Sequence, residues 1–525
     1  MRRISITTRV CTAGSLALAL ACASCVSGPD YQRPQLNARV PQARVSDGYK
    51  SATAQEAAQP GLGQDWWKVF QDPDLNALVE EALDANQNLK AAMARVAQAR
   101  ASAASVKSSF FPVVTLDPSE TRSRRPVSIT SSNPTASTTT GSSQTSTTST
   151  EIETKTVGST GTSVQIPFDL SYEIDIWGRV RRSYEAAQAE TQASVCELEV
   201  VRQTLLADLA RNYFNLRSFD AQHEILARNL ALYQEQVDLT QNQYKAGLIN
   251  ETNVLQAKVQ LESTRVQTAD IQRQRADLEH AIAILLGRAP VQFSLDFRSL
   301  DAIPPAIPAG LPADLLRRRP DVAEAEQNLV AACAEIGVAK ADFFPAVRLT
   351  GSAGFQSTDI KNVLDWQDRV WSIGPSISLP IFKGGQLRAK LRQAKARYDE
   401  LEATYRNNVL SAFSDVEDSL TDLHARADEA GATAKAVAAA REYLRLTRIQ
   451  YQTGTVDYLQ VMDAEKTLLT NELSEAQILN QRMASTILLI KALGGGWESQ
   501  PSASAEEAQP SDTPRMTATS AFPPP

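Results

Sequence analysis

Histidine and cysteine, the residues that most often build catalytic and metal sites, are scarce in this chain of 525 residues. It contains three histidines, His223, His280 and His424, and five cysteines, three of which fall within the first 25 residues. The other two, Cys196 and Cys333, lie in helical patterns without Cys-x-x-Cys spacing, which is typical of small apolar packing residues. We therefore expect no metal site, no redox pair and no histidine acting as a general base.

Clustered positive charge is also missing. The chain has 53 Lys and Arg against 60 Asp and Glu, a formal net charge of −7, and no basic block. Nucleic-acid binding depends on clustered cations that displace counterions from phosphate, so we expect no nucleic-acid partner. No nucleophile paired with a base and no glycine-rich phosphate loop stands out either, and the chain is expected to be neither an enzyme nor the carrier of a cofactor.

Residues 1–24 are predicted to be an export signal. Arg2 and Arg3 precede an uncharged stretch over residues 10–21 that contains several leucines. A positive start followed by a short apolar core is typical of a secretory signal, and this core is too short to span a bilayer as a helix.

Two cysteines compete as a lipid-attachment site. Cys22 and Cys25 both follow small residues, a pattern similar to the signal of bacterial lipoproteins, in which the cysteine becomes the acylated N-terminus. Neither is followed by Asp, the residue that commonly retains lipoproteins in the inner membrane, so we expect the outer membrane as the destination. Residues 25–65 would then be a lipid-anchored N-terminal segment. Ordinary signal cleavage with incidental cysteines is the alternative.

Internal repetition is the strongest feature of the sequence. Two copies of one structural unit are predicted over 66–287 and 314–497, joined by a proline-rich linker over 288–313. The matching segments are residues 109–116 with 342–349 at an offset of 233, and 244–247 with 451–454 and 284–287 with 491–494 at an offset of 207.

Each copy contains a stretch that predicts a very long helix. Residues 180–246 contain neither Gly nor Pro, and residues 386–453 repeat this, interrupted only by Gly431. A helix of about 65 residues is about 100 Å long, so it cannot fold around a globular core and must pack laterally against similar helices. Apolar residues at coiled-coil spacing mark its contact stripe in the first copy: Leu226, Leu230, Tyr233, Val237 and Tyr244.

A second pattern, strict alternation of apolar and polar residues, predicts long strands. It holds over residues 163–176, and residues 347–355 and 371–381 alternate likewise. A strand of this length, at about 3.3 Å per residue, is able to cross a bilayer even when tilted. A soluble sandwich strand would also alternate. Aromatic residues favour the membrane, because they fall where strand meets helix, the level of an aromatic girdle: Phe110, Phe111, Phe343, Phe344, Trp177 and Phe382.

Two segments have compositions that cannot bury a core. Residues 131–150 contain 15 Ser or Thr in 20 positions, which predicts an extracellular loop over about 120–162. A linker in a soluble protein would have the same composition. Residues 498–525 are predicted to be an unstructured tail.

From residue 22 to residue 497 the chain resembles the TolC-type outer-membrane factors, specifically the lipoprotein branch that serves RND-type tripartite efflux pumps. The matching motifs, in chain order, are Gly-Pro-Asp-Tyr at 28–31, Asp-Trp-Trp at 65–67, the two Phe-Phe-Pro turns, Asp-Ile-Trp-Gly-Arg at 175–179, Arg-Arg-Arg-Pro-Asp at 317–321, Tyr-Gln-Thr-Gly at 451–454 and Leu-Gly-Gly-Gly-Trp at 493–497. In that family Cys25 takes the place of the acylated cysteine, which favours it over Cys22. The Ser/Thr-rich insert and the tail depart from the family pattern.

The resemblance implies a mixed α and transmembrane β fold, a trimeric 12-stranded β-barrel continued by a long α-helical barrel. The number of predicted strands also requires a trimer, independently of the resemblance. Two strand pairs give four strands per chain, fewer than the smallest closed membrane barrel, and an open sheet edge cannot face lipid. Three copies supply the strands. The polar positions Asp169, Glu173 and Asp175 would then face the lumen and favour cations there.

The tips of the helical hairpins are the remaining candidate sites. Gly247 and Gly454 end the long helices, and the family docks its periplasmic adaptor at such tips, here Gly247 and Leu248 with Gly454, Thr455 and Val456. Leu459 and Asp463 are four residues apart on one helix face and match the family positions that close the tunnel mouth. Ordinary coiled-coil packing for Leu459 and a solvated face for Asp463 is the alternative. The run at 317–319 is interpreted as a helix-start surface feature.

Together these observations predict a passive export channel in the cell outer membrane, with its helical part in the periplasm and no catalysis. Its expected partners are two further copies of itself, a periplasmic adaptor (membrane fusion) protein, an inner-membrane efflux transporter and outer-membrane lipid. A trimeric coiled-coil adhesin is the alternative from the structural class; the internal duplication speaks against it. The exported substrate is selected by the pump and is not encoded in this chain.

Overall fold

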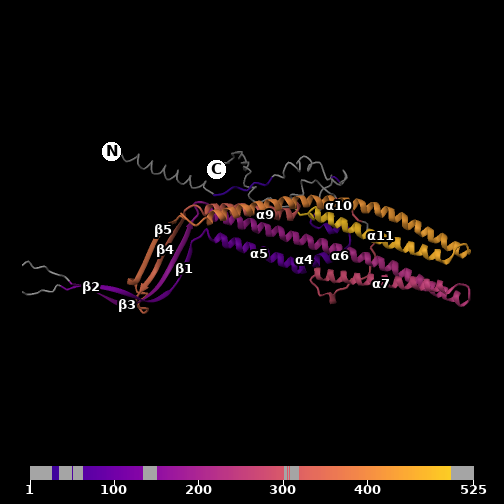
Figure 1. Cartoon of the computed structure of the whole chain (residues 1–525), viewed down its shortest axis with the longest axis horizontal. Helices are drawn as coiled ribbons and strands as arrows, with labels where there is room; N and C mark the ends of the chain where they lie inside the picture. The colour runs from indigo at the N-terminus through magenta and orange to yellow at the C-terminus, as the bar shows by residue number, and fades with distance from the viewer. Residues whose placement is uncertain are drawn as a thin grey trace, which may run out of the picture. The chain divides into compact units, whose positions relative to one another are not determined.

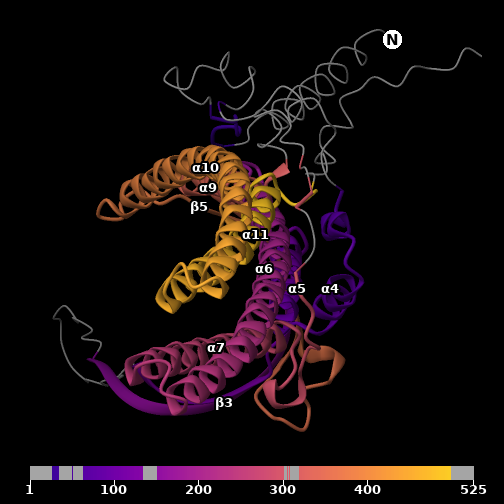
Figure 2. The same ribbon diagram turned by 90° about the vertical axis from the view of Figure 1, so that its right-hand side faces the viewer.

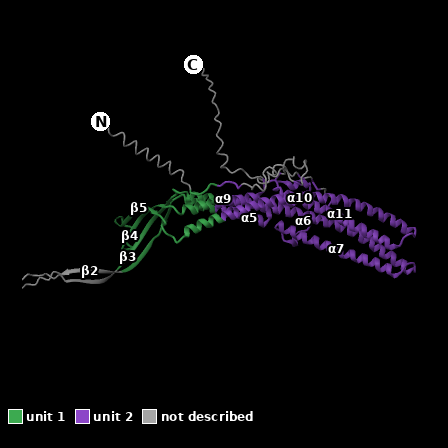
Figure 3. Cartoon of the chain, turned by 45° about the horizontal axis from the view of Figure 1, so that its top comes forward, with its two compact units in different colours: residues 1–30, 102–186, 333–396 green, residues 31–101, 187–332, 397–525 purple. Residues whose placement is uncertain are grey.

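The computed structural model describes residues 27–34, 50, 63–133, 151–300, 304–305, 307 and 318–497. The predicted signal, both candidate acylation cysteines and the tail lie outside the described residues. Contacts divide the chain into two units, which are described separately (Figure 3). Unit 1 comprises residues 1–30, 102–186 and 333–396, and unit 2 comprises residues 31–101, 187–332 and 397–525.

Helices of matched length make up most of the described chain. The pairs are α5 (Gln87–Ser108) and α9 (Pro320–Ala341) with 22 residues each, α6 (Arg179–Lys245) and α10 (Gln386–Gln452) with 67, and α7 (Glu251–Leu285) and α11 (Tyr458–Ala492) with 35. Partners start 233 positions apart in the first pair (320 minus 87) and 207 apart in the others (386 minus 179, 458 minus 251). The two predicted long helices are therefore confirmed, and Gly431 does not interrupt α10.

In unit 2 each long helix lies along its shorter successor as a hairpin, α6 with α7 and α10 with α11 (Figures 1 and 2). The contact stripe predicted on α6 is largely confirmed, because Leu226, Tyr233 and Val237 are buried with residues of α7 and with Leu469 of α11. Tyr244, the last residue of the predicted stripe, is exposed. Apolar residues spaced three or four apart hold such hairpins together.

The largest core of unit 2 gathers around the middle of α6. The short helix η1 (Trp66–Phe70) and α4 (Pro73–Ala85) bury their apolar side chains against Tyr213 and Phe214 of α6 and against residues near the end of α11. Asp72 fixes this arrangement: its carboxylate accepts hydrogen bonds from the first backbone amides of α4 and, at 2.8 Å, from the Tyr213 hydroxyl. The two tryptophans of the Asp-Trp-Trp motif, Trp66 and Trp67, are thus core residues.

An antiparallel sheet forms the strand part of unit 1. Its order is β1 (Val113–Leu116), β3 (Glu151–Ile174), β4 (Ala346–Ser357) and β5 (Arg369–Ser378), and β2 (Ser119–Asn133) also pairs with β3. β1 and β2 follow one another along the same edge of β3, separated by Asp117 and Pro118. The break falls at Pro118, which has no amide hydrogen to continue the ladder. Because β1 and β2 share one edge of β3, the sheet has four strand positions.

Two predictions about this sheet are corrected. The loop predicted over about 120–162 is largely strand: β2 extends to Asn133, and β3 begins at Glu151, in register with it. Threonine is β-branched and favours the extended backbone, so a Ser/Thr-rich segment forms a ribbon without an apolar core. The strand predicted to run to residue 176 ends at Ile174. The other two predicted strands, 347–355 and 371–381, are found as β4 and β5, although β5 ends at Ser378.

Cys196 and Cys333, predicted to be packing residues, are buried free thiols. Burial raises the pKa of the Cys196 thiol to about 11, which keeps it protonated at neutral pH.

Candidate functional site

The hairpin tip between α6 and α7 is closed by a glycine. Gly247 has a φ of +70°, the Gly247 amide donates to the Tyr244 carbonyl and the Leu248 amide donates to the Gln243 carbonyl, both at 2.9 Å. This pair of bonds is a Schellman motif, which satisfies the last carbonyls of a helix. The tip presents Leu248 to solvent, 74% exposed.

The tip between α10 and α11 has the same geometry. Gly454 has a φ of +75°, the Gly454 amide donates to the Tyr451 carbonyl at 3.0 Å, and the Thr455 amide donates to the Gln450 carbonyl at 2.9 Å. A Cβ added at either tip glycine would meet nothing within 4 Å, so the requirement for glycine comes from the backbone conformation and not from crowding. Thr455 is exposed and Val456 half-buried.

Leu459 and Asp463 lie in the first two turns of α11, and both are exposed, Leu459 to 58%. The contacts between α10 and α11 use other residues, namely Leu444, Tyr458, Val461 and Ala464. Within the chain Leu459 is therefore not a coiled-coil packing residue. The pair shares one face, which no residue of the buried cluster occupies.

A buried carboxylate lies two residues beyond Asp463. Glu465 on α11 is 5% exposed, and its Oε1 accepts a bond of 2.9 Å from the Arg448 guanidinium of α10. Its Oε2 is buried and has no hydrogen-bond partner among the described residues. Burial raises the pKa of Glu465, and Arg448 opposes the rise. Sequence reasoning missed this residue; its place one position after Ala464 in the buried stripe was the available signal.

The acidic end of β3 meets arginines. Glu173 contacts Arg179 at 2.8 Å and Arg348 at 3.5 Å, and its side chain is 18% exposed. Asp175 follows the strand and accepts hydrogen bonds from the backbone amides of Val180 and Arg181, so it caps the first turn of α6. Arginines thus compensate the charge of both carboxylates. That the two residues face a lumen stays a prediction. Asp169 lies in β3, opposite Thr115 of β1.

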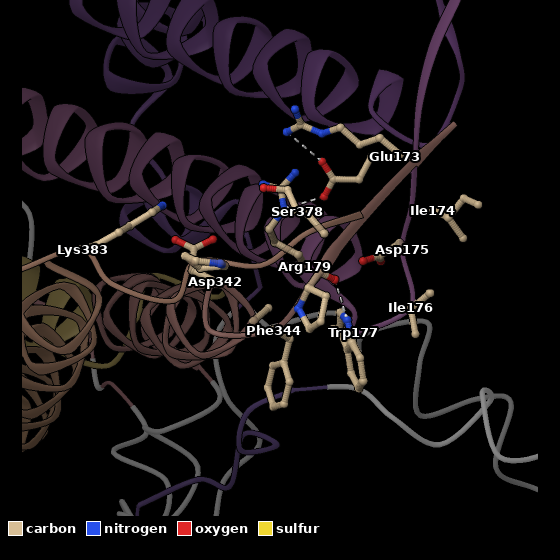
Figure 4. Close-up of a pocket in the computed structure, with 15 residues that line it drawn as sticks. Glu173, Ile174, Asp175, Ile176, Trp177, Arg179, Asp342, Phe344, Ser378 and Lys383 are labelled. Atoms are coloured by element: carbon tan, nitrogen blue, oxygen red, sulfur yellow. Dashed lines mark hydrogen bonds and ion pairs between the residues drawn. The ribbon is translucent and has the colours of Figure 1, made fainter. Parts of the chain in front are cut away.

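Glu173, Asp175 and two of the arginines, Arg179 and Arg348, line a cavity of about 370 Å³ at the junction of strands and helices in unit 1 (Figure 4). One side carries the ionic groups, including Asp342 and Lys383. On the other side the rings of Trp177 and Phe344 stack with centroids 4.7 Å apart, and the Trp177 indole donates to the Pro345 carbonyl at 2.9 Å. Two of the aromatic residues predicted to lie where strand meets helix, Trp177 from the first repeat and Phe344 from the second, thus stack on each other.

Residues 27–30, which follow the candidate acylation site, contact α6, α9 and the segment just before α6. In unit 1 the Ser27 amide donates to the Trp177 carbonyl, Gly28 lies against Gly337 of α9, and Asp30 pairs with the buried Arg182 at 2.6 Å. A Cβ at Gly28 would come within 2.5 Å of the Gly337 Cα, so only glycine fits there.

The same segment continues in unit 2, where Glu326 of α9 receives both Tyr31 and Arg33. The Tyr31 hydroxyl donates at 3.2 Å, and the Arg33 guanidinium makes a two-pronged contact with bonds of 2.7 and 2.5 Å. The Gly-Pro-Asp-Tyr motif thus holds the N-terminal segment against α6 and α9.

Arg319, from the predicted surface run at 317–319, is instead mostly buried. Its guanidinium pairs with Asp321 at 2.6 Å and with Asp415 of α10 at 2.9 Å, and it also donates to the Ala492 carbonyl. It joins the start of α9 to α10 and α11, so the surface interpretation is wrong for this residue. Arg317 lies outside the described residues.

No helix in the described part of the chain combines the length and apolarity needed to cross a membrane. Within the same residues no group of three or more His, Cys, Asp or Glu side chains is arranged to hold a metal ion.

Comparison with known proteins gives consistent matches along the chain. The family described as outer membrane efflux protein matches residues 78–288 and 311–495. The toluene efflux pump outer membrane protein TtgF of Pseudomonas putida is 32% identical over 492 residues, 92% of this chain and 96% of the relative. The cation efflux system protein CusC of Escherichia coli is 29% identical over 493 residues, 92% of this chain and 98% of the relative. The solved outer-membrane channel OprN aligns with a TM-score of 0.77 at 32% identity, covering 90% of this chain and 99% of that one.

The long helical hairpins and the antiparallel sheet align with the solved structure of OprN over 90% of this chain, so the fold is that of an outer-membrane channel. The chain belongs to the outer membrane efflux protein family. It is an efflux channel component, as predicted, and the adhesin alternative is not supported.

Proposed function

We propose that three copies of this chain form a passive duct through the outer membrane, which a periplasmic adaptor and an inner-membrane transporter complete as a tripartite export system. The duct has no catalytic step. Relatives named for toluene and for cations match nearly the whole chain, which supports the view that the pump, and not the duct, selects the cargo.

The two faces of the sheet carry this proposal. Side chains alternate along a strand, so the register assigns one face to Phe168, Leu170 and Tyr172 of β3 and to their partners on the neighbouring strands. The partners on this apolar face are Val114, Leu116, Val347, Leu349, Ala353, Trp371, Ile373 and Ile377. Trp371, Ile373 and Ile377 are about 70% exposed in the single chain (74, 69 and 71%), which suits contact with lipid.

Three copies would close the open edges of this sheet. Among the strands that the structure describes, β5 pairs on one side only, and so does the edge formed by β1 and β2. Unpaired backbone groups cannot remain in hydrocarbon. Four strand positions per chain give twelve in a trimer. The matched helix lengths, and the offset of 207 shared by two of the three helix pairs, support an internal duplication, through which each copy supplies equivalent helical columns.

Exposed apolar stripes on the hairpins also favour copies packed side by side. Leu255, Val259 and Val266 of α7 are 53, 66 and 70% exposed, and Leu446 and Ile449 of α10 are both 45% exposed. Spacings of three, four and seven residues are those of a helix face that packs against another helix. We assign these stripes to contacts between chains.

The N-terminal contacts support acylation at Cys25. Ser27, two residues after that cysteine, is bonded to Trp177 at the strand–helix junction. Acyl chains on Cys25 would therefore enter the membrane at the aromatic level of the sheet, where Phe111 and Phe382 are also exposed.

Leu459 and Asp463 are assigned to the closed mouth of the duct, and the two glycine tips to the adaptor. The exposure of Leu459 in the single chain supports this role, because a side chain outside the buried cluster of its hairpin is available to meet its two symmetry copies on the axis.

Neighbouring residues of β5 provide a matched test of the membrane face. Ile373 lies on the apolar face and Ser372 on the opposite one, and both are exposed in the single chain. Ile373→Arg should destabilise the assembled protein by about 2–4 kcal/mol and deplete it from outer-membrane fractions, whereas Ser372→Arg should be tolerated. Equal tolerance of both substitutions, or a native mass that corresponds to a single chain, would contradict the proposal.

A further inference from the structure

Two arginines stand on the apolar face of the sheet, at one end of it. The register pairs Arg122 with Thr162 and Arg124 with Thr160. Since side chains alternate along each strand, both arginines project on the same face as Val164, Ile166 and the apolar residues that follow. Both are exposed, and here β2 and β3 continue past the end of β4 (Figure 1).

A third arginine, Arg369, lies at the start of β5, toward the same end of the sheet. Arg369 pairs with Phe355 of β4, which pairs with Ile166, so it belongs to the apolar face as well. Its guanidinium carbon lies 4.5 Å from the centre of the Trp366 ring and Nη1 donates to the Trp366 carbonyl at 2.9 Å. Trp366 is 74% exposed. A charged group held against an exposed indole is the arrangement of a side chain at a membrane–water interface.

The distance along β3 sets the level of the arginines. From Ile174, next to the aromatic junction, to Thr162 the chain advances by about twelve residues, or about 40 Å along the strand. A tilt of about 45° reduces this to about 28 Å across the membrane, slightly more than the apolar band of about 25 Å typical of membrane strands. Arg122 and Arg124 therefore come just beyond the hydrocarbon, on the side away from Trp177. Arg369 is level with Ile166, about 19 Å across the membrane by the same measure, so its backbone lies within the apolar band and its long side chain extends toward the headgroups.

We propose that Arg122, Arg124 and Arg369 form a docking surface for the phosphate headgroups of anionic lipids in the leaflet on that side. The inference rests on the proposed membrane-spanning role of the sheet. Guanidinium groups match phosphate oxygens in a two-pronged geometry, and cations next to an anionic lipid surface are favoured over neutral side chains. Glu120 lies on the same face, one step nearer the hydrocarbon, and weakens the attraction.

The test measures lipid binding by the purified full-length protein. Native mass spectrometry in an uncharged detergent gives apparent dissociation constants for phosphatidic acid and for phosphatidylcholine. The double variant Arg122→Gln/Arg124→Gln should bind phosphatidic acid about thirtyfold more weakly, about fivefold per arginine, with unchanged binding of phosphatidylcholine. Glu120→Gln should tighten binding. The control Lys258→Gln/Lys466→Gln removes the same charge from exposed sites on α7 and α11 and should leave binding unchanged.

Equal affinity of the double variant and the parent for phosphatidic acid would overturn the proposal. So would competition by inorganic phosphate stronger than that of chloride at the same ionic strength, because it would assign the arginines to a free-anion site. Flotation of the parent with phosphatidylcholine vesicles separates the two levels of the argument. Failure to float refutes the membrane role and the docking surface together, whereas flotation without preference for phosphatidic acid refutes the docking surface alone.

Discussion

Replacing Leu459 with Ser tests whether this residue closes the mouth of the duct without contributing much to the stability of the fold. The magnitude for stability follows from burial. Full burial of a leucine side chain stabilises by about 1.5–3 kcal/mol, and Leu459 is 58% exposed, so its loss should lower the free energy of unfolding by only about 0.6–1.3 kcal/mol. In the closed trimer, however, three copies would lose the apolar plug together, and the duct should conduct more.

Val461 supplies the matched control. It is two residues away on α11 and only 3% exposed, within the cluster that joins α10 and α11. Val461→Ser leaves a cavity and buries a hydroxyl, which should destabilise by about 2–4 kcal/mol without widening the mouth. The two variants therefore separate packing from closure, although both replace an aliphatic residue with serine on the same helix.

The assay pairs thermal unfolding of the purified protein with single-channel recording in planar bilayers. Leu459→Ser should lower the parent's melting temperature only slightly and raise the conductance, and Asp463→Asn should keep the conductance of the parent but weaken block by divalent cations added on the helical side. A Leu459→Ser variant that conducts like the parent, together with unchanged block in Asp463→Asn, would refute the assignment and leave the closure elsewhere on the tip.

Three further predictions concern other parts of the chain. Because the pKa of Glu465 is raised above its ordinary value of 4.5, its contribution to stability is present below that pH and is lost as the pH rises through the folded-state pKa. Glu465→Gln should remove this fall from the pH profile of the melting temperature, and an unchanged profile would assign the fall to other groups. Gly337→Ala places a Cβ 2.7 Å from the Ser27 carbonyl oxygen and should release the N-terminal segment, at about 1–3 kcal/mol. Proteolysis near Tyr31 should accelerate relative to Gly431→Ala, where the added Cβ meets nothing, and equal rates would show that the segment is held by its other contacts. Cys25→Ala should abolish labelling with a radioactive fatty acid, whereas Cys22→Ala should retain it; the reverse result would move the anchor to Cys22.

The features that the sequence predicts correctly are those with a strong period. A long run of residues without a helix breaker, or a strict alternation of apolar and polar residues, leaves one regular structure as the solution, and α6, α10, β4 and β5 lie where the patterns indicate. The tip glycines were also predictable, because a positive φ at a helix end favours glycine regardless of tertiary contacts.

The features that the sequence hides depend on neighbours far along the chain. Asp175 continues the alternation of β3, yet it caps α6, because the pattern does not reveal where the strand gives way to the helix. Glu465 looks like any surface acid until α10 brings Arg448 against it. The ribbon formed by β2 and β3 does not show the strict alternation of apolar and polar residues from which a strand is predicted. Backbone pairing and β-branched residues stabilise its strands instead.

The most direct test of the account is the conductance of the purified protein in a planar bilayer, recorded together with its native mass. A passive duct of three chains predicts discrete conductance steps that need no nucleotide or cofactor, from a species three times the mass of the mature chain. A protein that remains a single chain, or a trimer that inserts and never conducts in either the parent or the Leu459→Ser form, would contradict it.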